Sequence, residues 1–346
     1  MTSGGGRTLI RAKAPLRISF AGGGTDVPPF PEREGGLVLN ATINRYAYGT
    51  LRPREDDAIQ IDSHDYGMSA VFDVHEPLVF DGKLDLAKAA IRRFAGRDTR
   101  GFNLQLHSNA PPGSGLGSSS TMMVALIGLL KEHRNLPLTD YELADLAYTL
   151  ERTDLGIMGG LQDQYAATFG GFNFLELFGD RVVVNPLRIN REVILELEYN
   201  LLLCYSGTTR DGGRVIEDQT SRLEQGNEDT VSALRAQKDL AVEMKNALLR
   251  GKLGDFGALL DSAWQAKRRM SDRISTPRIE ELYDEARKAG ALGAKVTGAG
   301  GGGYLLIYCG NGSKHKVAAR MLELGADVEE IAFEPEGQRT WRAHDV

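Results

Sequence analysis

Three glycine-rich segments, at residues 21–26, 111–120 and 297–303, constrain this 346-residue chain more than any other feature. Each lies between stretches with strand or helix periodicity, so each predicts backbone that turns tightly or approaches another group closely. A single segment of this kind often serves only to form a tight turn. Three of them indicate a ligand held by bare backbone N–H groups, and phosphate is the common ligand of that kind.

The central segment, PPGSGLGSSS at residues 111–120, is the most specific of the three. Gly115 and Gly117 allow a tight turn, and three serines then open a predicted helix that runs to Leu130. Free N–H groups and the helix dipole favour phosphate at such a helix start, and a serine hydroxyl can ligate Mg²⁺. A serine-rich helix cap is the alternative, although three consecutive serines exceed what one cap requires.

Other motifs for phosphate binding or nucleophilic chemistry are absent. A P-loop needs GxxxxGK[ST], but both Gly-Lys pairs, at residues 82–83 and 251–252, are followed by leucine. No GxSxG nucleophile elbow occurs. Residues 298–303 match GxGxxG, yet the strand-like residues 304–308 follow where a dinucleotide fold requires a helix. We therefore predict no dinucleotide site.

Net charge and cysteine content narrow the expected binding partners and the expected cellular compartment. The net charge of −6 favours neither nucleic acid nor an acidic membrane surface as a partner. Cys204 and Cys309 lie far apart and in no CxxC pattern, so we expect neither a disulfide framework nor a cysteine metal site, and a reducing cytoplasmic setting. The apolar stretch Met122–Leu130 is too short to span a bilayer, and MTSGGGRTLI reads as a flexible leader.

Periodicity predicts a mixture of strands and helices without internal repeats. Strands are expected near residues 9–18, 37–51, 59–61, 69–72, 102–107, 182–184, 201–205 and 304–308. Helices are expected over residues 86–94, 118–130, 213–250, 256–270 and 279–289, with a capping box at Thr139–Glu142 opening another. A boundary near Pro186 divides the chain into two predicted lobes, 8–185 and 186–346.

Two carboxylates flank a glycine-rich turn at residues 156–160. Glu151 precedes the turn at the end of a predicted helix, and Asp163 follows it at the start of another. Phosphoryl transfer needs hard oxygen ligands for Mg²⁺ and a carboxylate near the attacking hydroxyl. The alternative is that Glu151 is a solvated helix end and that Asp163 is an N-terminal helix charge. The presence of the serine-rich segment favours the role in phosphoryl transfer.

Taken together, these motifs resemble those of the GHMP kinases across nearly the whole chain. Residues 111–120 look like that family's ATP-phosphate motif, residues 295–303 like its C-terminal glycine motif, and residues 14–26 like its N-terminal one. The resemblance implies a two-lobed α+β fold, with an N-terminal lobe like domain 2 of ribosomal protein S5 and a ferredoxin-like C-terminal lobe. It also implies transfer of the γ-phosphate of ATP, with Mg²⁺, to a small-molecule hydroxyl.

The resemblance also implies roles for individual residues. Asp163 would act as the catalytic carboxylate, Arg17 would stabilise negative charge beside it, and Glu151 with Ser119 would hold Mg²⁺. The ATP-phosphate motif comprises Pro112, Gly113, Ser114, Gly115, Leu116, Gly117, Ser118, Ser119 and Ser120. The expected substrate-binding residues are Gly23, Gly24, Thr25, Asp26, Arg210, Lys267 and Gly300.

Departures from the family pattern narrow the expected substrate. Galactokinases typically have Gly-Glu-His-Thr-Asp where this chain has Gly22–Asp26 as GGGTD, so the sugar end loses two polar groups and gains space. The run LRISFAGGGTDVPPF at residues 16–30 is similar to bacterial heptose 7-phosphate kinases, which implies phosphorylation at the anomeric C1 hydroxyl to give a 1,7-bisphosphate for surface polysaccharide. An unphosphorylated sugar such as fucose, and a non-catalytic sugar and ATP sensor, remain alternatives.

A substrate with a tail phosphate requires cations. Arg210 and Arg214 follow a glycine turn, and Lys267 and Arg268 lie in a predicted helix, so these four are the candidates, against ordinary surface charges. The expected partners are therefore ATP and a sugar phosphate. The sequence leaves open whether the protein forms a homodimer.

Overall fold

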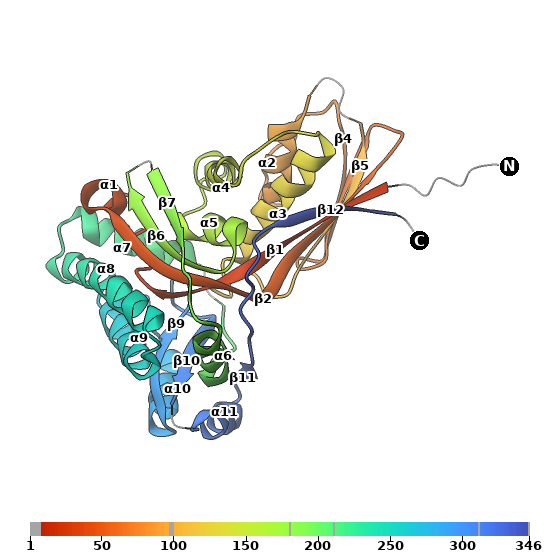
Figure 1. Ribbon diagram of the computed structural model, residues 1–346. Helices are drawn as coiled ribbons and strands as arrows, with labels where there is room; N and C mark the ends of the chain where they lie inside the picture. Colours follow the sequence, from red (N-terminus) through yellow and green to blue (C-terminus); the bar gives the residue numbers. More distant parts are fainter. Residues whose placement is uncertain (1–7, 97–99, 180, 210–211, 311, 345–346) are drawn as a thin grey trace.

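The computed structural model describes residues 8–96, 100–179, 181–209, 212–310 and 312–344 and forms two sheets with covering helices (Figure 1). The strands are β1 (Thr8–Ala21), β2 (Gly36–Pro53), β3 (Ala58–Ser63), β4 (Met68–Asp73), β5 (Phe102–Ser108), β6 (Phe172–Phe178), β7 (Arg181–Pro186), β8 (Leu201–Tyr205), β9 (Ala291–Val296), β10 (Tyr304–Cys309), β11 (Asp327–Glu329) and β12 (Arg339–His344). The helices are α1 (Phe30–Glu34), α2 (Asp85–Phe94), α3 (Ser118–His133), α4 (Asp140–Tyr148), the π-helix η1 (Thr149–Asp154), α5 (Gln162–Phe169), α6 (Arg191–Asn200), α7 (Gly212–Glu224), α8 (Glu228–Leu249), α9 (Leu253–Arg268), α10 (Pro277–Lys288) and α11 (Lys314–Glu323).

The first sheet has the order β12-β1-β2-β5-β3-β4, and β6 and β7 extend it from the other part of β2. Its pairs are antiparallel except for β3 with β5. Alternate residues of β5, Phe102, Leu104 and Leu106, enter a core with α2 and α3, which explains the alternating pattern that predicted this strand.

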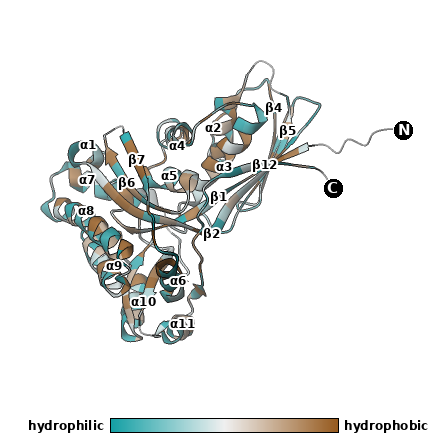
Figure 2. Ribbon diagram, in the orientation of Figure 1, coloured by the Kyte–Doolittle hydropathy of each residue, from teal (hydrophilic) through white to brown (hydrophobic). Residues whose placement is uncertain are grey.

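The second sheet, with the order β11-β8-β10-β9, is buried on both faces. Leu201 and Leu203 of β8 enter the core shared with the first lobe, whereas Leu202 and Cys204 enter a core with α10 and α11. A strand covered on both faces has no polar side, so β8 and β10 read as continuous apolar runs. Figure 2 shows both hydrophilic (teal) and hydrophobic (brown) residues on covering helices such as α8 and α9, as expected of helices with one buried face.

The shared core holds the two lobes together. Leu16, Ile18 and Phe20 of β1 pack with residues of α8 and α9 and with Leu203 of β8. In Figure 1, α8 lies beneath β1 and β2, and α9 lies beside α8. The remaining side chains of β1 are thereby fixed relative to both lobes.

The order of the elements agrees with an α+β chain of two lobes. The division between residues 185 and 186 stays a prediction. The chain leaves the first sheet after β7 and reaches the second at β8, but β12 pairs antiparallel with β1, so the last strand lies in the first sheet. The predicted leader mostly lies outside the described residues.

Most of the local sequence patterns predicted the observed structure correctly. Thr139 and Glu142 form the predicted capping box of α4. The predicted helix over 213–250 is instead two helices, because Gly226 takes a positive φ of 71° and Asn227 caps α8. Both cysteines are buried free thiols, as expected. Within the described ranges, no helix is long and apolar enough to cross a lipid bilayer.

Candidate active site

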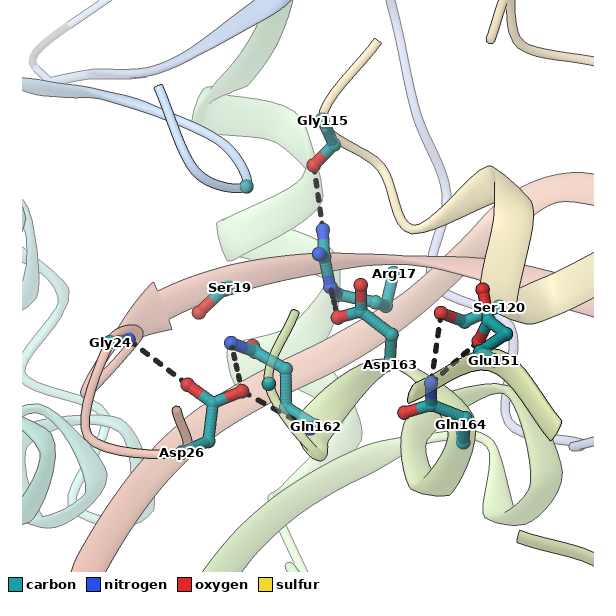
Figure 3. Close-up of polar contacts among 12 residues, drawn as sticks. Arg17, Ser19, Gly24, Asp26, Gly115, Ser120, Glu151, Gln162, Asp163 and Gln164 are labelled. Atoms are coloured by element: carbon teal, nitrogen blue, oxygen red, sulfur yellow. Dashed lines mark hydrogen bonds and ion pairs between the residues drawn. The ribbon is translucent and has the colours of Figure 1, made fainter. Parts of the chain in front are cut away.

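Arg17 and Asp163 form the centre of the site (Figure 3). Arg17 is nearly buried on β1, and Asp163 lies in the first turn of α5. The Arg17 Nε donates to Asp163 Oδ1 at 2.7 Å, and its Nη1 donates to the Gly115 carbonyl at 2.7 Å. One arginine therefore joins the candidate catalytic carboxylate to the central glycine-rich loop.

The start of α3 lies directly against this pair. A Cβ on Gly117 would lie 3.2 Å from the Asp163 carboxylate, so the loop and the carboxylate are in close contact. Gly117 is the N-cap residue, with φ of 75°, and no side-chain cap bond forms at this helix start within the described residues. The serine-cap alternative is therefore wrong, and the N–H groups at this helix start stay available for an anion.

Glu151 is fully buried and bonded to the serine segment. Ser119 Oγ donates to Glu151 Oε1 at 2.5 Å, and Gln164 Nε2 donates to Glu151 Oε2 at 2.6 Å. Glu151 lies in η1, and π-helical turns are often found at functional sites. A carboxylate and a hydroxyl beside a helix start fit Mg²⁺, which usually takes one or two protein oxygens and completes its shell with phosphates and water. In the described part of the chain, no cluster of three His, Cys, Asp or Glu side chains could hold a metal alone.

Asp26 lies on the opposite side of Asp163 from Glu151, as Figure 3 shows. It is 1% exposed and accepts bonds from the Gly24 N–H at 3.0 Å, the Gln162 N–H at 3.2 Å and Gln162 Nε2 at 3.1 Å. Burial, and secondly the charge of Asp163, raise the pKa of Asp26 above its usual value. A buried carboxylate with lone pairs left over is suited to accept bonds from substrate hydroxyls.

Two buried lysines of the second lobe bond to backbone carbonyls of segments that line the site. Lys267, in the last turn of α9, donates to the Gly298 carbonyl at 2.7 Å, and burial lowers its pKa to about 8, with Arg17 lowering and Asp26 raising it. Lys295 on β9 donates to the Ser19 carbonyl at 2.8 Å, and burial holds its pKa well below the usual value. Sequence reasoning missed Lys295, although a lysine inside an apolar strand was a usable signal.

Two glycines of the third glycine-rich segment pack against the central loop. A Cβ on Gly298 would lie 2.7 Å from Gly115 Cα, and a Cβ on Gly303 would lie 2.3 Å from the Ser114 carbonyl oxygen. These glycines are required because two backbones touch. Close approach to a ligand is thus only part of the reason for the glycines in this chain.

A cavity of about 210 Å³ brings most of the predicted residues together. It is lined by Arg17, Gly23, Gly24, Asp26, Gly113, Gly115, Gly117, Ser118, Ser119, Ser120, Asp163, Lys267 and Gly300, among others. A second cavity of about 310 Å³ shares Ser118, Ser119 and Ile157 with it and is also lined by Pro112 and apolar side chains.

Other predicted residues do not line the main cavity. Ser114 and Leu116 are buried, and the Thr25 hydroxyl donates to the carbonyl of Gly22 at 2.7 Å, so it holds the loop. Arg268 is paired with Glu280 at 3.2 Å. The exposed Arg214 is not among the lining residues, and Arg210 lies outside the described residues.

Comparison with known proteins identifies the family. The model of the GHMP kinase N-terminal domain matches residues 85–171, and that of the C-terminal domain matches residues 244–327. The chain therefore belongs to the GHMP kinases, which makes it a phosphotransferase with an alcohol acceptor and ATP as co-substrate.

Individual relatives are similar over their full length. The D-glycero-alpha-D-manno-heptose 7-phosphate kinase of Campylobacter jejuni is 40% identical over 337 residues, which is 96% of this chain and 99% of that protein. The crystal structure of a D-glycero-D-manno-heptose 1-phosphate kinase from Bacteroides thetaiotaomicron has a TM-score of 0.82 at 36% identity, covering 97% of this chain and 100% of that one. A mevalonate kinase structure at 19% identity and a TM-score of 0.73 shares the fold.

Proposed function

We propose that this chain transfers the γ-phosphate of ATP to the anomeric C1 hydroxyl of D-glycero-D-manno-heptose 7-phosphate. The observation that carries the proposal is the Arg17–Asp163 pair, which lies between the uncapped start of α3 and the polar corner around Asp26 (Figure 3). Such an arrangement puts a carboxylate between a phosphate site and a hydroxyl-binding site. The heptose kinase relatives support the choice of sugar.

The two ends of ATP would occupy the two adjoining cavities. Phosphates would accept bonds from the N–H groups at Gly117 and the serines, and the nucleoside would lie in the more apolar second cavity. Ser119 and Glu151 would hold Mg²⁺, which offsets phosphate charge. Asp163 would orient the attacking hydroxyl and accept its proton, and Arg17 would counter the negative charge that develops beside it.

The test is ADP release by the purified protein with Mg-ATP and a panel of acceptors. The panel contains heptose 7-phosphate, heptose 1-phosphate, mannose, fucose, galactose and mevalonate. Including both heptose phosphates matters because the two heptose kinase relatives differ in the position of the phosphate in their names. We expect strong turnover with heptose 7-phosphate alone. Turnover with a different acceptor would discard this substrate, and turnover with none would favour the sensor alternative, which the presence of Ser119, Glu151 and Asp163 disfavours.

We propose that Lys267 binds the tail phosphate of the substrate. Of the four cations predicted from the sequence, it is the one that lines the cavity within the described residues. Its pKa of about 8 means that its charge is present below pH 8 and is lost as the pH rises through that value.

The KM for the sugar phosphate should therefore increase above pH 8, approaching tenfold per pH unit, in initial rates measured from pH 6.5 to 9.5. The KM for ATP, and that for any unphosphorylated sugar accepted, serve as controls and should stay flat. Lys267→Arg keeps its charge over this range and should abolish the rise. A flat profile for the wild-type protein would contradict the role of Lys267.

A further inference from the structure

Two buried polar atoms at the sugar end of the cavity have no hydrogen-bond partner within the described residues. They are Ser19 Oγ and Gln162 Oε1, on side chains that are 3% and 7% exposed. Both residues line the main cavity. Buried polar atoms are nearly always paired, so an unpaired one next to a cavity calls for a partner that binds there.

The local backbone directs Ser19 to this position. Register shifts in the pairing of β1 with β2 fall between Pro15 and Arg17 and between Ser19 and Ala21. Between these shifts Arg17, Ile18 and Ser19 pair in regular register. Strand alternation therefore places Arg17 and Ser19 on the cavity side, while Ile18 enters the shared core.

Gly23 leaves the space in front of these two residues open. A Cβ there would lie 3.3 Å from Ser19 Oγ and 3.5 Å from Gln162 Nε2, and the φ of Gly23 is not in the left-handed region. Alanine would therefore be tolerated by the backbone but would fill the space between Gly23 and both side chains. Figure 3 shows Ser19, Gln162 and Asp26 on one side of Asp163.

The chemistry of this corner selects hydroxyl groups. Gln162 Nε2 donates one bond to Asp26, its Oε1 and the Asp26 carboxylate are acceptors, and Ser19 can donate or accept. A sugar hydroxyl can donate to either acceptor and accept from Ser19. We propose that Ser19 and Gln162 bind hydroxyls of the sugar and help to select a polyhydroxylated acceptor. This inference rests on the proposed function.

Ser19→Ala is the sharper test, because changing Gln162 would also remove a donor from Asp26. We expect the KM for the accepted sugar to increase about tenfold and the KM for ATP to stay unchanged. Because the alanine removes an unpaired buried hydroxyl, the melting temperature should stay level or rise. Gly23→Ala should raise the KM for the sugar as well. Ser262→Ala, whose hydroxyl already donates to Ala258 at 3.2 Å on α9, is the control and should change neither constant.

Four outcomes would overturn the inference. An unchanged KM for the sugar in Ser19→Ala would do so while leaving the proposed function intact. A clear fall in melting temperature would assign Ser19 a structural role instead, as would a crystal structure of the sugar complex in which Ser19 bonds only through water to Asn40, its cross-strand neighbour. If the wild-type protein phosphorylates no sugar in the panel, the proposed function fails and the inference fails with it.

Discussion

Asp163→Asn should lower kcat by about 10²- to 10⁴-fold, the range typical of a lost general base. Asparagine keeps the shape of the side chain and one acceptor for the Arg17 Nε, which now lies 2.7 Å from Asp163 Oδ1. It cannot take a proton from the attacking hydroxyl. The loss should therefore appear in turnover rather than in substrate binding.

The measurement is single-turnover phosphoryl transfer, paired with calorimetric titration of an ATP analogue. Nucleotide affinity should stay within about threefold of wild type, because the serine segment and the start of α3 are untouched. Asp140→Asn is a matched control in the exposed first turn of α4 and should retain full turnover. Near wild-type kcat in Asp163→Asn would show that another group accepts the proton.

Glu151→Gln should reduce kcat/KM for Mg-ATP by about two orders of magnitude and raise the Mg²⁺ concentration needed for half-maximal rate. The glutamine fits the same volume, but its amide is a poorer ligand for a hard cation than a carboxylate. It also presents a donor where the buried carboxylate now accepts from both Ser119 and Gln164. Binding of the sugar should change little, because Asp26 lies on the other side of Asp163.

The Mg²⁺ dependence separates metal binding from damage to the fold. Rates are measured from micromolar to tens of millimolar Mg²⁺ at fixed ATP, with the melting temperature as a check on folding. Glu142→Gln is a suitable control, since glutamine also serves in a capping box and this residue lies outside both cavities. If Glu151→Gln loses turnover with an unchanged Mg²⁺ dependence, the residue positions the serine segment and does not hold the metal.

Some features followed from the sequence because their causes are local. The central glycine-rich segment, the capping box at Thr139 and the alternation in β5 depend on neighbouring residues, so their patterns are visible in one stretch of chain. The two-lobed α+β fold and the kinase class followed from the motifs and their resemblance to a known family, and the comparisons agree with both. The roles of Arg17, Asp163 and Glu151 stay predictions until they are tested.

The site itself was decided by tertiary structure, because its contacts join residues far apart in the chain. The Arg17–Asp163 bond spans 146 residues and the Lys295–Ser19 bond spans 276. No sequence window contains such a pair. The first bond depends on how β1 packs against α5, and the second on how β1 packs against β9 of the second lobe. Packing likewise decided that Thr25 supports its own loop and that the third glycine segment touches backbone. The sequence determines which residue types are present. Whether a side chain faces substrate or protein depends on which other parts of the chain pack against it in the folded structure.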